Sequence, residues 1–248
     1  MKTLGIVGGI APESTIEYYR LLISSYRERV PDGSAPSIVI DSIDLKKLLD
    51  LTAVGDLAGL TAYLVGEVRL LARAGADLAL LAANTPHIVF DEVLREAPIP
   101  LVSIVEATCA AAKALRSKKL ALFGTRFTMQ GRFYREVFSR EGIALVVPAE
   151  ADLTFIHDKY VGELLRGVYR PETREALLAI VNRLKESEGI DGVILGGTEL
   201  PLILKSGTVH GIPLLDTTRI HVEAALDELL GAPPRGPRSE PERSRGRR

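Results

Sequence analysis

Cysteine is almost missing from this chain of 248 residues, which contains Cys109 alone and no tryptophan. A single cysteine excludes a framework of internal disulfides and is typical of proteins of the reducing cytoplasm, where we expect this one. Histidines number only four, and no two of them stand at a metal-ligand spacing. Because there is also no HExxH pattern, the sequence predicts no metal site.

Long apolar runs and an excess of one charge are lacking too. No run reaches the roughly 18 to 20 residues that cross a bilayer, and the N-terminal MKTLGIVGGIAPEST is interpreted as a strand rather than a signal peptide. The formal net charge is −1, so the overall balance recruits neither nucleic acid nor a membrane. Residues 231–248 are the exception, with six arginines and four prolines. This basic tail is expected to be disordered, and a weak anionic contact is the alternative.

Strand-like and helix-like segments alternate along the rest of the chain. Apolar runs at 2–9, 36–43 and 77–85 are separated by segments with helical spacing at 12–30 and 57–75. A helix begun by proline is expected at 86–97, and a short strand running into a helix at 100–119. Strands that are apolar on both faces and separated by helices indicate a parallel sheet covered on both sides.

The pattern then repeats. Residues 118–128 echo residues 1–11, and 191–201 echo 77–87, at an offset of roughly 115 residues. The fold class expected is therefore α/β, with two pseudo-symmetric, doubly wound halves, parallel sheets and a ligand cleft between them. The first half takes 1–100 plus 213–230, whose last helix crosses back, and the second takes 101–212.

Four strand ends should converge on that cleft, because ligands of open α/β sheets bind outside the carboxyl ends of the strands. They are Gly8-Gly9, Ala83-Asn84-Thr85, Gly124-Thr125 and Gly197-Thr198-Glu199. The first precedes a helix, so backbone amides at Gly9, Ile10 and Ala11 could hold a carboxylate-sized anion. Alternatively, Ser14 or Thr15 serves only the backbone of a tight turn. No GxGxxG or GK[ST] pattern supports a nucleotide.

Asparagine and threonine side chains can bond both the ammonium and the carboxylate of an amino acid. Asn84, Thr85, Thr125 and Thr128 are candidates for this contact, although each could equally be a turn or cap residue. His87, just inside a helix, could be a purely structural histidine. Cys109 lies in an alanine-rich segment and resembles a small buried apolar residue.

With these motifs the chain resembles the cofactor-independent aspartate/glutamate racemase family, from Met1 to about Leu230. The matching pieces are GIVGG, ESTIEYYRLL, NTPH, GTRFTMQGRFY, GGTELPLIL and LLDTTRIHVEAAL. The resemblance implies an active site between two α/β halves, a homodimer, and no pyridoxal phosphate or other cofactor. It also implies an acid/base pair on opposite faces of the substrate's α-carbon.

The chain departs from the family at that pair. The usual pattern has cysteine or threonine before NT and a second cysteine between Gly and TE, and these positions are Ala83 and Gly197 here. Neither side chain ionises, so two-thiol racemisation is expected to be lost. By resemblance, Asn84, Thr85, Thr125 and Thr198 would hold the substrate.

Two further sets of residues are candidates for the site. Lys46 or Lys47 could meet a side-chain carboxylate. Glu199 and His87 are the titratable groups left at the strand ends. Either could act as a one-sided acid or base, or could support neighbouring groups.

Three functions remain open for a protein that binds a small acidic amino acid or dicarboxylate. The first is a divergent cofactor-free lyase, isomerase or cyclisation enzyme. The second is a non-catalytic binder or sensor of an acidic amino acid. The third is an amino-acid racemase that uses other residues, or a variant whose catalytic residues were removed.

Overall fold

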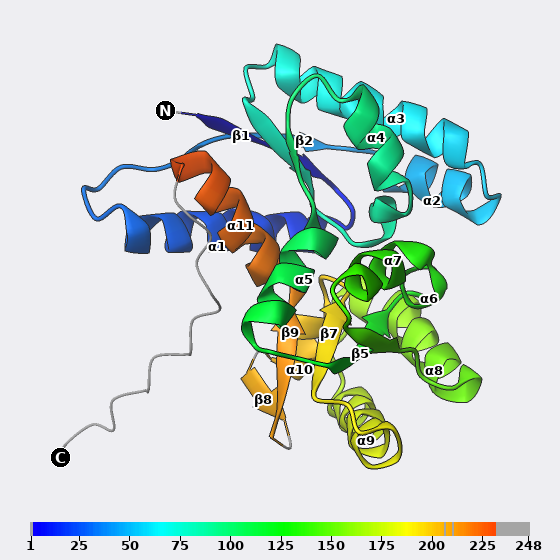
Figure 1. The fold of residues 1–248 in the computed structure, drawn as a ribbon. Helices are drawn as coiled ribbons and strands as arrows, with labels where there is room; N and C mark the ends of the chain where they lie inside the picture. Colours follow the sequence, from blue (N-terminus) through cyan, green and yellow to red (C-terminus); the bar gives the residue numbers. More distant parts are fainter. Residues whose placement is uncertain (1, 206, 210, 232–248) are drawn as a thin grey trace.

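The computed structural model describes residues 2–205, 207–209 and 211–231, which form two sheets (Figure 1). The basic tail expected to be disordered is 231–248, and its residues 232–248 lie outside the described residues. In the first sheet the order is β2-β1-β3-β4 and all pairs are parallel. Its strands are β1 (Thr3–Gly8), β2 (Ser37–Ser42), β3 (Leu78–Leu81) and β4 (Leu101–Val102).

The second sheet has the order β6-β5-β7-β9-β8. Its strands are β5 (Lys119–Gly124), β6 (Ala144–Val146), β7 (Gly192–Gly196), β8 (Gly207–Val209) and β9 (Ile212–Asp216). All neighbours are parallel except β8, which runs antiparallel to β9. Only two residues separate the end of β8 from the start of β9, and so short a connection can join only antiparallel strands. This edge therefore differs from the all-parallel sheet that was predicted. The α/β class with two parallel-rich sheets is confirmed.

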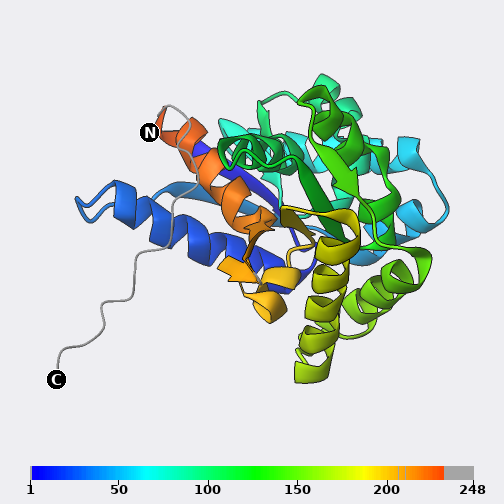
Figure 2. The same cartoon turned by 60° about the horizontal axis from the view of Figure 1, so that its bottom comes forward.

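Successive side chains along the strands of the first sheet point to opposite faces, and each face packs against its own layer of helices. Leu4 and Ile6 pack with α1 (Pro12–Arg29) and α11 (Thr217–Leu230), whereas Val7 packs with α3 (Leu57–Arg73). The helices α2 (Leu45–Ala53) and α4 (Phe90–Glu96) lie on the α3 side. Figures 1 and 2 both show α1 and α11 side by side, so the last helix does cross back to the first sheet.

The second sheet has its own core and its own helices. They are α5 (Ile104–Ala114), α6 (Arg126–Gln130), α7 (Arg132–Arg140), α8 (Glu150–Gly162), α9 (Pro171–Glu188) and α10 (Leu200–Leu204). The helices α6 and α7 are separated at Gly131, where a Cβ atom would lie 2.6 Å from the carbonyl oxygen of Phe127. The helix expected from Pro86 begins as a 3₁₀ turn, η1 (Thr85–Val89), before α4.

Strand pairing places two segments differently from the predicted boundaries. Leu101–Val102 pairs with β3 of the first sheet, and Ile212–Asp216 pairs with β7 of the second. Residues 101–102 therefore pair within the first sheet and residues 213–216 within the second, because the backbone hydrogen bonds of a neighbouring strand decide which sheet a strand joins. The division of the chain into two domains itself stays a prediction.

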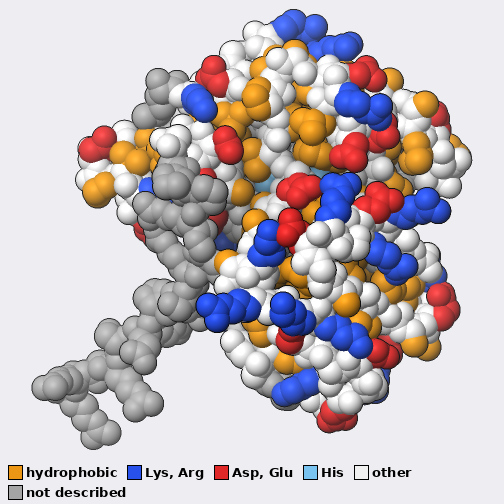
Figure 3. Space-filling view, viewed as in Figure 1, with side chains coloured by type: hydrophobic (Ala, Val, Ile, Leu, Met, Phe, Trp, Pro, Cys, Tyr) orange, Lys and Arg blue, Asp and Glu red, His pale blue; other side chains and the backbone are white. Residues whose placement is uncertain are grey.

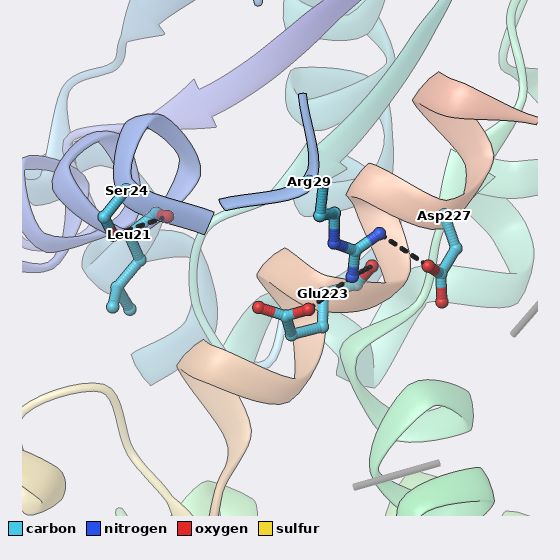
Figure 4. A network of polar contacts seen from close by, with 5 residues as sticks. All are labelled: Leu21, Ser24, Arg29, Glu223 and Asp227. Atoms are coloured by element: carbon cyan, nitrogen blue, oxygen red, sulfur yellow. Dashed lines mark hydrogen bonds and ion pairs between the residues drawn. The ribbon is translucent and has the colours of Figure 1, made fainter. Parts of the chain in front are cut away.

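Polar contacts between α1 and α11 are concentrated at Arg29, whose side chain is 2% exposed (Figure 4). Its Nη1 donates to Asp227 Oδ1 at 2.6 Å, and its Nη2 donates to the carboxylate and the backbone carbonyl of Glu223. The guanidinium thus ties the end of the first helix to the last helix.

The surface shows acidic and basic side chains interspersed over the face seen in Figure 3. This mixture agrees with the near-zero net charge of the sequence. Among the described residues, no helix combines the length and the apolar character that spanning a membrane requires.

Candidate active site

The carboxyl ends of strands from the two sheets meet, as the sequence predicts. Thr85, after β3, has its hydroxyl oxygen 3.3 Å from that of Thr125, after β5. Thr125 also caps α6, because its Oγ1 accepts the backbone N–H of Thr128 at 3.2 Å. The hydroxyl oxygens of Thr125 and Thr128 are 3.1 Å apart. A group of three hydroxyls therefore lies where the two sheets approach one another.

Asn84 connects both sheets through a buried hydrogen-bond network. Its Nδ2 donates to Thr217 Oγ1 at 3.2 Å, and its Oδ1 accepts from the hydroxyl of Tyr134 at 2.6 Å. Thr217 Oγ1 in turn donates to the carbonyl of Leu195 in β7 at 2.7 Å. These bonds hold the amide plane in one orientation and leave one amide N–H and one oxygen lone pair for other partners.

The glycine turn after β1 is held by its own side chains. Gly9 has φ +81°, and a Cβ there would lie 2.7 Å from the carbonyl oxygen of Ile43, so only glycine fits. Its N–H donates to Thr15 Oγ1 at 2.7 Å, and Ser14 Oγ donates to the carbonyl of Ala11 at 2.8 Å. The alternative in which Ser14 and Thr15 serve the backbone describes this turn. The amide of Gly9 is therefore bonded to Thr15, and an anion contact of the amides at Gly9, Ile10 and Ala11 stays a prediction.

His87 is a structural residue rather than an acid or base. Its Nδ1 donates to the carbonyl of Ala83 at 3.0 Å, and its Nε2 accepts the backbone N–H of Ile104 at 3.2 Å. The ring stacks on Phe90 with centroids 4.7 Å apart. Burial, the largest cause, lowers its pKa to about 3. With both ring nitrogens bonded to backbone groups, the catalytic role considered for His87 is not supported.

The two candidate lysines lie on the surface of α2. The Nζ of Lys46 pairs with Asp50 at 2.5 Å, and the Nζ of Lys47 sits 4.0 Å from the ring centroid of Tyr63. In the described part of the chain, no hydrogen bond or ion pair joins either lysine to the strand-end residues. The structure therefore does not bring Lys46 or Lys47 into contact with the candidate site.

Ala83 and Gly197 stand at the predicted strand ends, and neither offers an ionisable group. Ala83 is packed in the apolar cluster that includes Val89. Cys109 is buried in α5, where burial and the nearby carboxylate of Glu106 raise the pKa of its thiol to about 11. The one thiol of the chain is therefore protonated, and it lies within α5 rather than at either strand end.

Tyr160 of α8 occupies the space beside Gly197. A Cβ atom at residue 197 would lie 2.8 Å from both the Cζ and the hydroxyl oxygen of Tyr160, and closer still to its Cε2. The Tyr160 hydroxyl donates to Glu199 Oε2, which also accepts from Thr198 Oγ1 at 2.9 Å. The other oxygen, Glu199 Oε1, is buried and has no hydrogen-bond partner among the described residues.

Burial dominates the electrostatics of this pair. It raises the pKa of the Glu199 carboxyl, although the bonds from Tyr160 and Thr198 act in the opposite direction. It also raises the pKa of the Tyr160 phenol well above its ordinary value, so the phenol stays neutral. Sequence analysis did not identify Tyr160, because α8 carries none of the family motifs and its contact with Gly197 exists only in the folded chain.

Two hollows lie away from the strand ends. A hollow of about 590 Å³ is lined by Asp152 and Arg183 among others, and one of about 380 Å³ lies between α3 and α4. Asn84, Thr198 and Glu199 are each no more than 3% exposed. The ligand cleft between the halves therefore stays a prediction.

Comparisons with a family model and with individual known proteins all indicate the same family. Residues 7–225 match the family model described as Asp/Glu/Hydantoin racemase. A solved aspartate racemase homologue from Pyrococcus horikoshii is 36% identical, with a TM-score of 0.81 over 93% of this chain and 100% of that one.

Two further relatives are more distant. The broad specificity amino-acid racemase RacX of Bacillus subtilis is 24% identical over 92% of this chain and 98% of that protein. Glutamate racemase from Francisella tularensis, solved with D-glutamate, shares the fold at 14% identity, with a TM-score of 0.62 over 93% of this chain and 81% of that one.

Proposed function

Because the chain belongs to the Asp/Glu/Hydantoin racemase family, we propose that it binds a small acidic amino acid or dicarboxylate where its two sheets meet. The hydroxyls of Thr85, Thr125 and Thr128 and the amide of Asn84 support this proposal. Hydroxyls both donate and accept, so they can satisfy a carboxylate and an ammonium group on one ligand. The ligand binds without a cofactor.

The reaction we propose is not two-thiol racemisation. The observation that carries this conclusion is the absence of an ionisable side chain at residues 83 and 197. Inversion needs one group to remove the α-proton and another to return a proton to the opposite face, and losing general acid/base help costs about 10²- to 10⁴-fold per group. A lyase, isomerase or cyclisation step needs proton transfer on one face only, and positioning and electrostatics supply the remainder.

Access to the site constrains the mechanism. The side chains of Asn84 and Thr198 are almost fully buried, so a ligand reaches them only when the strand ends of the two sheets separate. We expect ligand binding to involve a movement of one sheet and its helices relative to the other. Such motion is common for ligands bound between domains.

A thermal-shift screen of amino acids and dicarboxylates tests the binding proposal. A ligand at 100 times its Kd adds about 2.7 kcal/mol of stability, which is roughly 5–11 °C in the melting temperature of a chain of this size. The variant Thr125→Val should lose most of that shift, because it removes the central hydroxyl but keeps the side-chain volume. A flat response to aspartate, glutamate and dicarboxylates would contradict the proposal.

A non-catalytic binder is the second candidate. It is favoured by the fact that the strand-end side chains bond to one another and that Ala83 offers no acid or base on the first sheet. A tight ligand that is recovered unchanged, with its α-hydrogen intact in D₂O, would establish this alternative. Measured conversion of an L- to a D-amino acid would instead show a racemase that uses other residues.

A further inference from the structure

Gly197 and Tyr160 fit together as a complementary pair. Where the family resemblance places a side chain at residue 197, this chain has none, and the Tyr160 ring fills that volume from α8. The hydroxyl oxygen of Tyr160 lies 2.8 Å from the point where a Cβ at residue 197 would stand. A titratable oxygen is thus held at the strand end that lost its ionisable side chain.

Tyr160 has a direct proton acceptor. Its hydroxyl donates to Glu199 Oε2, and Thr198 Oγ1 donates to the same oxygen at 2.9 Å, which holds the carboxylate in place. The second oxygen of Glu199 is buried without a partner among the described residues. Burying a carboxylate oxygen without a hydrogen bond costs free energy, so Oε1 is available to accept a proton.

We propose that Tyr160 is the catalytic proton-transferring residue of this site, with Glu199 as its positioning residue and proton acceptor. This inference rests on the proposed function, because it supplies the one-sided proton transfer which that function requires. It gives the second sheet a proton-transferring group, while Ala83 leaves the first sheet without one.

The step balances without a cofactor or co-reactant. The Cα–H bond of the bound acid breaks, and its electron pair passes into the adjacent carboxyl group as an enolate. The proton moves to the phenolic oxygen of Tyr160 while the phenolic proton passes to the Glu199 carboxylate. While the enolate persists, the hydrogen on the phenolic oxygen exchanges with solvent, and reversal of the relay then returns a solvent-derived hydrogen to the same face of the carbon. In D₂O the α-position therefore gains deuterium with retention of configuration.

The groups facing Glu199 determine how this relay depends on pH. Glu13 of α1 adds a negative charge that raises the pKa of Glu199 further, beyond the effect of burial. The phenols of Tyr160, Tyr169 and Tyr18 also face Glu199, and burial raises the pKa of each. The carboxylate form is the acceptor, so exchange should rise with pH through a pKa above 4.5, the ordinary value of a glutamate.

Deuterium exchange at the α-carbon of L- and D-aspartate and L- and D-glutamate tests the inference, followed by ¹H NMR with the full chain. We expect exchange with retention of configuration in the native protein. Tyr160→Phe keeps the ring beside Gly197 but lacks the hydroxyl, and should reduce exchange by about 10²-fold or more. Glu199→Gln should reduce it similarly and abolish the rise with pH. Tyr19→Phe, which removes an exposed phenol on α1 outside the site, should leave the rate unchanged.

The outcomes separate the relay from the proposed function. If the native protein exchanges the α-hydrogen and Tyr160→Phe does so within about threefold of the native rate, the relay is wrong and the proposed function stands. A native protein that binds these acids but exchanges none of them overturns both the relay and the enzymatic function. Melting temperatures of all variants and their thermal shifts with aspartate and glutamate distinguish lost chemistry from lost folding or binding.

Discussion

Gly197→Ala is the substitution that most directly tests the packing of the site. Carbon atoms pack at about 3.5–4.0 Å, whereas the new methyl would stand 2.8 Å from Cζ and the hydroxyl oxygen of Tyr160. Tyr160 is 4% exposed and cannot swing into solvent without opening the core. Overpacking costs about 1–3 kcal/mol, and displacing the phenol from Glu199 costs about 1–3 kcal/mol more. We expect a loss of about 3 kcal/mol, or roughly 6–12 °C in melting temperature.

Denaturant unfolding of a small set of variants provides the measurement. Gly66→Ala is the matched control, because Gly66 lies inside α3 with nothing within 4 Å of its added Cβ and should gain up to about 1 kcal/mol. Tyr160→Ala should cost about 3–5 kcal/mol. In the double variant the new methyl of Gly197→Ala falls into the vacated space, so the combined loss should be at least about 1 kcal/mol below the sum. Wild-type stability for Gly197→Ala, or strict additivity, would refute this reasoning.

The remaining predictions concern three other buried side chains, those of His87, His221 and Arg29. Burial lowers the pKa of His87 to about 3 and of His221 to about 4, so below about pH 6.5 the unfolded chain takes up protons that the folded chain does not. The free energy of unfolding should then fall as pH drops from 6.5 to 5, by up to about 1.4 kcal/mol per pH unit for each histidine. Urea unfolding at several pH values measures this slope, and His221→Gln should remove about half of it. Arg29→Ala should destabilise the fold by about 2–3 kcal/mol, at the low end for a buried pair because Asp227 can rehydrate in part. In the same assay, Arg20→Ala should change stability by less than about 0.5 kcal/mol, because the side chain of Arg20 is 69% exposed, and equal losses for both arginines would contradict the role assigned to Arg29.

Much of the fold follows from local sequence pattern. The apolar runs of β1, β3, β5 and β7 are buried on both faces, which distinguishes parallel strands covered by helices on both sides. The repeat at roughly 115 residues predicts the two sheets, because similar segments reach similar local energy minima. Local pattern does not reveal the sheet to which β4 and β9 belong, because that is decided by the strands with which they pair.

Part of the candidate site could also be predicted from the sequence. Thr85 and Thr125 are predicted to converge because each follows a parallel strand, and their hydroxyls lie 3.3 Å apart. His87 and Lys46 were predicted less well. Both residue types are common in active sites. Nothing local reveals that the distant backbone N–H of Ile104 bonds to the second ring nitrogen of His87. The pairing of Lys46 with Asp50, in contrast, is a local i,i+4 contact on α2.

The sequence by itself determined the α/β layers, the strand ends that meet and the absence of ionisable groups at Ala83 and Gly197. Only the tertiary structure decided what stands beside Gly197. Tyr160 lies 37 residues earlier in the chain, on a helix that covers the same sheet. No sequence spacing predicts its contact with Gly197. Strand and helix periodicities are local properties of a chain, whereas the filling of a missing side chain's volume depends on which distant residue the packed core brings there.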